Sequence, residues 1–116
     1  MGDASGRYAA LTQRLVDTVL GAPGHTTGEL RRAVMARGVG GARPGAPADG
    51  VPSQLAGYVD KIALHAYEVT DADVAALQRA GGSDDALFEV TVSAALGAAL
   101  GRLERGLAAL RGGGRA

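Results

Sequence analysis

Apolar side chains recur at steps of three and four residues along most of this chain, which is the spacing of one face of an α-helix. The first such stretch predicts a helix over about residues 5–20, whose apolar face consists of Tyr8, Leu11, Leu15 and Val19. Gly21 and Pro23 then discourage its continuation. A second helix, with the sequence GELRRAVMARG, is expected to begin after a cap at Thr27 and to stop at Gly38.

The next stretch, GVGGARPGAPADGVP, has no periodic apolar pattern and predicts a linker. It is not expected to bind phosphate, because no strand precedes it and no Gly-Lys-Ser/Thr follows it. A third helix is expected with Pro52 in its first turn. Its apolar stripe consists of Leu55, Tyr58, Val59, Ile62, Ala66 and Val69. Leu64 and Tyr67 fall on the far side of that helix, which predicts a second neighbour in the same chain or in another.

Two further helices have clear capping signals. Thr70 and Asp73 have the spacing of a capping box, and Ser83 is expected to cap a long helix over about residues 84–110. One side of this last helix has a coiled-coil-like seam of Leu96, Leu100, Leu103, Leu107 and Leu110. The opposite side carries Leu87, Val90, Ala94 and Ala98. Gly97 and Gly101 permit the close approach of another helix, and the two apolar faces predict that protein covers this helix on both sides.

Together these elements predict an all-α bundle of about five helices, because no segment has the pattern of a strand. The expected organisation is an N-terminal helical pair over 1–37, a Gly/Pro-rich loop over 38–51, a three-helix core over 52–111 and a disordered tail over 112–116. Hydrophobic residues make up 47% of the chain but aromatic residues only 3%. The core must therefore form by close approach of helices instead of by filling space with large side chains.

Charge and cysteine content exclude several classes of function. The formal net charge is zero and the arginines are scattered, so nucleic-acid binding is not expected. The chain has no cysteine, which excludes disulfides, thiolate metal sites and thiol peroxidase chemistry. The N-terminus lacks an apolar signal segment, and the uncharged run from Val90 to Gly101 is too short to span a bilayer. A soluble cytoplasmic protein that does not bind membranes is therefore the expectation.

The stretch from Tyr58 to Leu110 resembles the AhpD-like family, which includes carboxymuconolactone decarboxylases and alkylhydroperoxidase-type proteins. The resemblance is carried by VTDADVAAL, AGGSDDALFEVTV and AALGAALGRLERGL, in this order and at this spacing. It implies an all-helical domain that assembles into oligomers with helices shared across subunit contacts, and it implies redox or decarboxylase activity. The redox motif of the family is a Cys-x-x-Cys pair followed by a histidine, with a glutamate upstream. No position here matches that motif, so no catalytic residue is carried over.

Two side chains are candidates for acid–base chemistry. His65 ordinarily titrates near neutral pH and lies at the edge of the apolar stripe of the third helix. Glu89 is the only charged residue between Asp85 and Arg102, and its candidate partners are Arg79, Arg102 and His65. The simpler interpretations are a boundary histidine and a surface or interface glutamate. Arg102 and Tyr67 are candidate substrate-binding residues; no metal site and no cofactor are predicted, because there are only two histidines and no thiol.

These observations leave three hypotheses open. The first is an AhpD-like protein without redox cysteines that serves as an oligomeric binding or structural module, self-associating through the third and fifth helices. The second is a non-redox decarboxylase or isomerase that acts on a small organic acid, with His65 and Glu89 as acid and base and Arg102 holding the substrate carboxylate. In the third, the chain works with a separate subunit that carries the missing cysteine helix.

Arg31 and Arg32 are interpreted as a solvated helix face.

Overall fold

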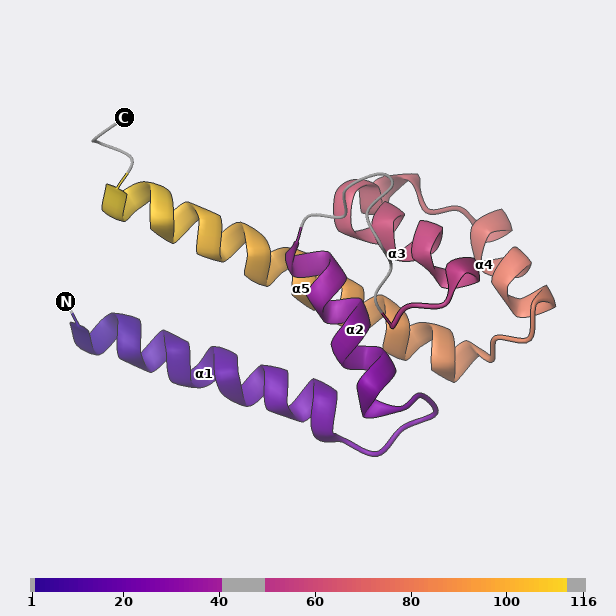
Figure 1. Cartoon of the computed structure of the whole chain (residues 1–116), viewed down its shortest axis with the longest axis horizontal. Helices are drawn as coiled ribbons and strands as arrows, with labels where there is room; N and C mark the ends of the chain where they lie inside the picture. The colour runs from indigo at the N-terminus through magenta and orange to yellow at the C-terminus, as the bar shows by residue number, and fades with distance from the viewer. Residues whose placement is uncertain (1, 41–49, 113–116) are drawn as a thin grey trace.

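The computed structural model describes residues 2–40 and 50–112, and every regular element in this part of the chain is helical. In chain order the elements are α1 (Gly2–Gly21), α2 (Gly28–Val39), α3 (Ser53–His65), the 3-10 turn η1 (Ala66–Glu68), α4 (Asp71–Arg79) and α5 (Asp84–Gly112). The predicted all-α fold of five helices is confirmed over these residues (Figure 1). Most of the predicted Gly/Pro-rich loop and of the predicted tail lies outside the described residues.

The predicted caps are confirmed. The Thr27 hydroxyl accepts the Leu30 N–H at 3.0 Å, and the Ser83 hydroxyl accepts the Ala86 N–H at 3.1 Å. Thr70 and Asp73 form the reciprocal capping box at the start of α4. The lysine amine of Lys61 lies 3.0 Å from the Asp73 carboxylate and so links α3 to this cap. These bonds satisfy N–H groups that a helix start leaves without intrahelical partners.

Gly38 does not stop the second helix, so the stop predicted there is wrong. The helix continues to Val39, and Gly38 is buried within it. A Cβ on Gly38 would lie 2.7 Å from the Ala94 carbonyl oxygen of α5. Glycine is therefore required here by the close approach of another helix and not by a turn. The packing of α2 against α5 thus overrides the weak local tendency of glycine to end a helix.

Helices α2 and α5 cross with their backbones in near contact. A Cβ on Gly97 would collide with the backbone of Met35, and one on Gly101 would lie 2.5 Å from the Val39 carbonyl oxygen. The predicted role of Gly97 and Gly101 in close helix approach is confirmed. The main core lies beside this crossing and joins α2, α3 and α5 through the buried side chains of Val34, Val51, Val59, Ile62, Val90 and Ala94. α2 thus shares one core with the segment from residue 52 onward.

One ion pair fixes α3 against α2. The Arg37 guanidinium donates two hydrogen bonds to the Asp60 carboxylate, one of them at 2.7 Å. Both side chains are largely buried, with exposures of 10% for Arg37 and 25% for Asp60. The carboxylate raises the pKa of Arg37 further, so the arginine stays charged. A bidentate pair of this kind sets the orientation of two helices as well as holding them together.

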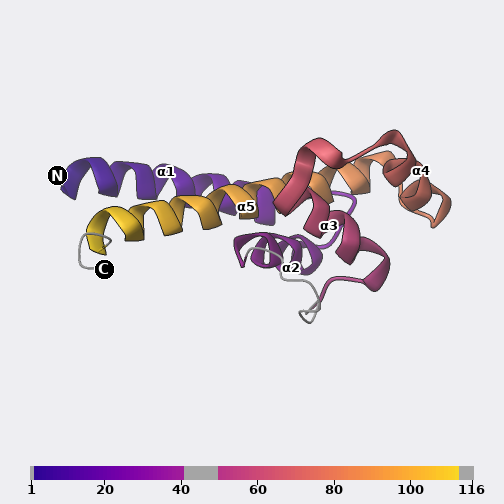
Figure 2. The same cartoon turned by 90° about the horizontal axis from the view of Figure 1, so that it is seen from above.

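The N-terminal half of α5 is covered by protein, but its C-terminal half is not. Leu87, Val90, Ala94 and Ala98 are buried as predicted, and Leu96 and Leu100 are half-buried. Beyond Gly101 the helix projects from the core beside α1, and the two run in opposite directions as a pair of arms (Figures 1 and 2). Leu103, Leu107 and Leu110 there are exposed. A single chain therefore leaves this half of α5 uncovered, and the expectation that protein covers both of its faces stays a prediction that a second chain would have to satisfy.

The far side of α3 is also open. Leu64 is 42% exposed and Tyr67 is 84% exposed, so no described part of the chain supplies the second neighbour that the sequence predicts for this patch.

Candidate functional site

Three of the four predicted site residues lie around the C-terminal end of α3. His65 ends α3, and its ring meets that of Tyr67 edge to face, with centroids 5.9 Å apart. Arg102 reaches across from α5 and donates a hydrogen bond of 2.7 Å to the Ala63 carbonyl oxygen. This contact satisfies one of the carbonyl groups that a helix end leaves without partners. The guanidinium of Arg102 therefore binds the end of α3, whereas a substrate carboxylate was the expected partner.

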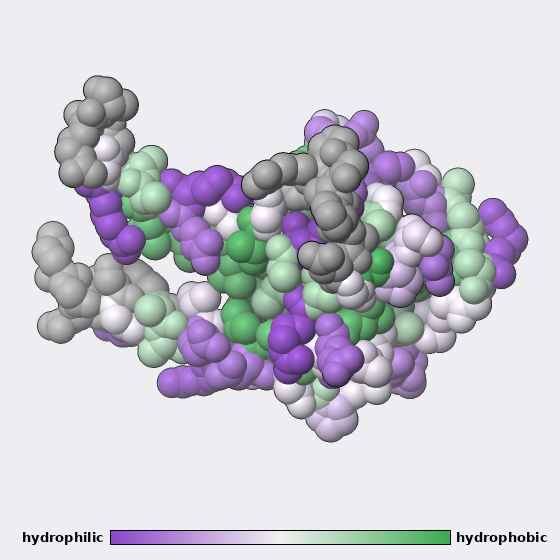
Figure 3. All heavy atoms as spheres, viewed as in Figure 1, coloured by the Kyte–Doolittle hydropathy of each residue, from purple (hydrophilic) through white to green (hydrophobic). Residues whose placement is uncertain are grey.

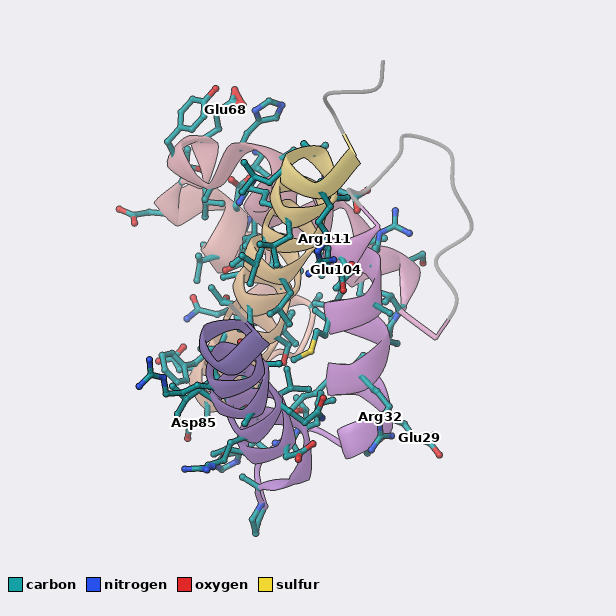
Figure 4. The ribbon with its side chains drawn as sticks, turned by 90° about the vertical axis from the view of Figure 1, so that its left-hand side faces the viewer. Glu29, Arg32, Glu68, Asp85, Glu104 and Arg111 are labelled. Atoms are coloured by element: carbon teal, nitrogen blue, oxygen red, sulfur yellow. The ribbon has the colours of Figure 1, made fainter. Side chains whose placement is uncertain are left out.

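The surroundings of His65 are those of a surface group. Its side chain is 53% exposed, and its Nδ1 lies 3.8 Å from the Glu68 carboxylate on η1. Tyr67 projects still further into solvent. Glu68 is labelled at the upper left of the view along the arms, away from α1 and α2 (Figure 4). The group resembles a solvated helix end more than a site that excludes water.

Glu89 lies elsewhere, on the second turn of α5. It precedes Arg102 by 13 positions in one helix, which corresponds to about 20 Å along the helix axis. Its carboxylate accepts hydrogen bonds from the His25 N–H at 2.7 Å and from the N–H and hydroxyl of Thr26. The structure thus places Glu89 against the loop between α1 and α2 and not beside Arg102. None of the partners predicted from the sequence is among these donors.

The loop is shaped around this carboxylate. A Cβ on Gly24 would lie 2.7 Å from a Glu89 carboxylate oxygen, so glycine allows the chain to pass close to it. The His25 Nε2 lies 3.4 Å from Asp85, one turn earlier on α5. The hydroxyl of Thr26, the N–H of His25, the N–H of Thr26 and the charge of Arg31 lower the pKa of Glu89 to about 2. At neutral pH this carboxylate is ionised and satisfied, which suits it to hold a loop and not to exchange protons.

Arg31 is the residue that the sequence analysis misjudged. Arg32 is exposed as expected, but Arg31 is only 6% exposed and donates a hydrogen bond of 3.1 Å to the Val19 carbonyl oxygen. Its Nε is buried without a hydrogen-bond partner among the described residues. The spacing contained a signal for this burial, because residues 31, 34, 35 and 38 make up the buried face of α2. With Glu89, Arg31 lines a small pocket of about 180 Å³ whose other walls are mainly apolar.

A larger hollow lies between the two arms. It has a volume of about 800 Å³ and is lined by α1 on one side and by the C-terminal half of α5 on the other. Leu100, Leu103 and Leu107 contribute its α5 wall, and Glu104 and Arg111 are the charged groups on that wall. In the space-filling view, hydrophobic atoms gather at the base of the arms, where this groove begins (Figure 3). We call it the arm groove.

The described residues offer no metal site and one helix with the length and composition of a membrane span. No group of three histidine, cysteine, aspartate or glutamate side chains there has the arrangement of a metal site. α5 is long and apolar enough to cross a membrane by length and composition, and 39% of its most apolar window is buried within the chain. A core helix that packs on α2 and α3 passes the same test, so this is weak evidence for a membrane location.

No protein-family model matches this sequence, and no curated protein or solved structure is significantly similar to it. The function must therefore be argued from the geometry.

Proposed function

We propose that this chain is an AhpD-like helical protein without redox cysteines that acts as a self-associating binding or structural module. The observation that supports this most strongly is the pair of projecting arms, whose leucines remain exposed in the isolated chain. Contiguous apolar surface of this kind marks an interaction site in a soluble protein. The missing cysteines leave the fold expectation of the family resemblance intact and remove its thiol chemistry.

An acid–base enzyme receives less support from the arrangement. The proposed pair needs His65 and Glu89 within reach of one substrate, yet Glu89 is held by the α1–α2 loop while His65 is at the end of α3 beside Arg102's contact. A carboxylate with a pKa of about 2 is also a weak base at neutral pH. The separate-subunit hypothesis stays a prediction, which a pull-down from the native source tests.

Analytical ultracentrifugation of the purified full chain tests self-association directly. We expect a species heavier than the 11.6 kDa chain at micromolar concentration. A stable monomer at 100 µM would contradict the proposal. A crystal structure of the assembled protein would test the family part, because it would show whether helices are shared between subunits as the resemblance implies.

A further inference from the structure

We infer that a second copy of this chain packs across the arm groove, so that α1 and the C-terminal half of α5 from two copies form a four-helix bundle. This inference rests on the proposed self-association and deepens it by naming the surface. Two antiparallel arms already form half of such a bundle (Figures 1 and 2). A two-fold axis completes it, because one patch then meets its own copy and the assembly closes.

The arms carry apolar side chains that the chain itself leaves uncovered. Leu11 and Leu15 of α1 are each 51% exposed, and Leu103, Leu107 and Leu110 of α5 are 48%, 37% and 84% exposed. The leucines of α5 lie on one seam at steps of four and three residues, which is the spacing that interdigitates with another helix. The arm groove of about 800 Å³ between the two helices would receive such side chains from a partner.

The exposed area of the chain is larger than a compact monomer of this mass requires. The chain exposes 7431 Å², whereas a folded monomer of 11.6 kDa exposes about 5,800 Å². The radius of gyration is 15.5 Å, compared with about 13 Å for a compact domain of this length. A standard interface takes about 800 Å² from each partner. The arms, whose leucines are exposed, contribute to this excess area, which is larger than one partner's share of a standard interface.

The charges in the groove are compatible with a second copy as the partner. Glu104 and Arg111 both line the groove and lie two turns apart on α5. In the view along the arms, both project from α5 toward the side on which α2 lies (Figure 4). Neither forms an ion pair with another described residue. Glu104 and Arg111 lie on either side of Leu107 along α5. A two-fold axis near Leu107 pairs the position before the axis in one copy with the position after it in the other. Glu104 of each copy would therefore lie close to Arg111 of the other.

The first experiment compares charge insertions at two exposed leucines. Leu107→Glu should raise the dissociation constant of the dimer by about 100-fold or more, because a carboxylate would enter the apolar centre of the interface. Leu64→Glu is the matched control, since Leu64 has similar exposure but lies on α3, away from the arms. Sedimentation equilibrium measures the association, and circular dichroism confirms the helical content of both variants.

The outcomes separate this inference from the broader proposal. A monomeric wild-type chain would overturn both. A wild-type oligomer that persists in Leu107→Glu, or one that is lost only in Leu64→Glu, would overturn the arm interface while leaving self-association intact. A monomeric chain that binds a different protein through the arms would equally overturn a second copy as the occupant.

A crosslink provides a measurement that does not depend on weakening the interface. The chain contains no cysteine, so Leu107→Cys introduces a single thiol next to the inferred two-fold axis. Two copies should then form a disulfide-linked dimer under mild oxidation, because a disulfide needs Cα atoms within about 7 Å. Ala80→Cys, exposed at the end of α4, is the control and should stay unlinked. Equal crosslinking of both variants, or none at position 107, would overturn the inference.

Discussion

At the scale of single residues, Glu89 holds the α1–α2 loop onto α5, and Arg31 of α2 holds α1. Glu89 accepts hydrogen bonds from His25 and Thr26, while the buried guanidinium of Arg31 binds the Val19 carbonyl at the end of α1. A buried guanidinium is stable only where hydrogen bonds and a neighbouring negative charge replace water. Glu89 supplies part of that charge, since Arg31 is among the groups that lower its pKa. Glu89 and Arg31 therefore have a structural role.

The first prediction concerns Glu89→Gln. The pKa of Glu89 is about 2 in the folded chain and about 4.3 in an unfolded one, so its contribution is complete above pH 5 and is lost as the pH falls toward 2. The amide should lower the free energy of unfolding at pH 7 by about 1–2 kcal/mol, since charge-assisted hydrogen bonds are lost. Urea unfolding across this pH range should give a shallower acid slope for the variant. Glu68→Gln, on the exposed η1 turn, should retain the wild-type slope.

At the scale of the helices, the sequence predicts elements better than it predicts their partners. The caps at Thr27, Thr70 and Ser83 are local chemistry, and the sequence identifies them correctly. Gly38 on its own predicts a helix stop. Only the position of α5 shows that this glycine instead allows α2 and α5 to approach closely. The candidate site depends still more on distant packing, because the spacing along α5 does not show that the loop between α1 and α2 contacts Glu89.

The second prediction tests the crossing of α2 and α5. Gly97→Ala should lower the free energy of unfolding by about 1–3 kcal/mol, because the new methyl group meets the Met35 backbone, which cannot rotate away as a side chain would. Gly57→Ala is the matched control within α3, where a Cβ has no neighbour within 4 Å. That change should stabilise the chain by about 0.5–1 kcal/mol through helix propensity. Chemical denaturation measures both values, and equal effects of the two substitutions would contradict the close crossing.

A third prediction concerns the start of α4. Thr70→Ala should destabilise the chain by about 1 kcal/mol, because the Asp73 N–H loses its capping hydroxyl. The pKa of Asp73 should stay below its ordinary value in the variant, since the Thr70 N–H and the Lys61 amine still lower it. Hydrogen exchange should show faster opening confined to the first turn of α4. Protection lost equally in α5 would show that the cap acts on the whole fold.

At the scale of the whole molecule, the chain combines a well-packed body with two arms that it does not cover. The body joins α2, α3 and the first half of α5 through one core. The arms extend the molecule to 49 Å in its longest dimension, compared with 24 Å in its shortest. The sequence does predict an apolar seam along α5, but it cannot say whether the same chain or another copy covers it. The structure shows that α1 leaves Leu103, Leu107 and Leu110 exposed within one chain, and the length and direction of α1 cannot be deduced from the seam itself.

The last prediction concerns how the melting temperature depends on protein concentration when the arms pair. If two copies share the arm interface, folding and association are coupled, so the melting temperature must rise with protein concentration. A rise from 1 to 100 µM adds about 1.4 kcal/mol per chain, which corresponds to about 5 °C for a domain of this size. Leu107→Glu should melt at one temperature across that range, because its arms no longer pair. Leu64→Glu should keep the wild-type dependence, since its exposed leucine lies outside the arms. A wild-type melting temperature that does not change with concentration would show that the arms contribute no association energy.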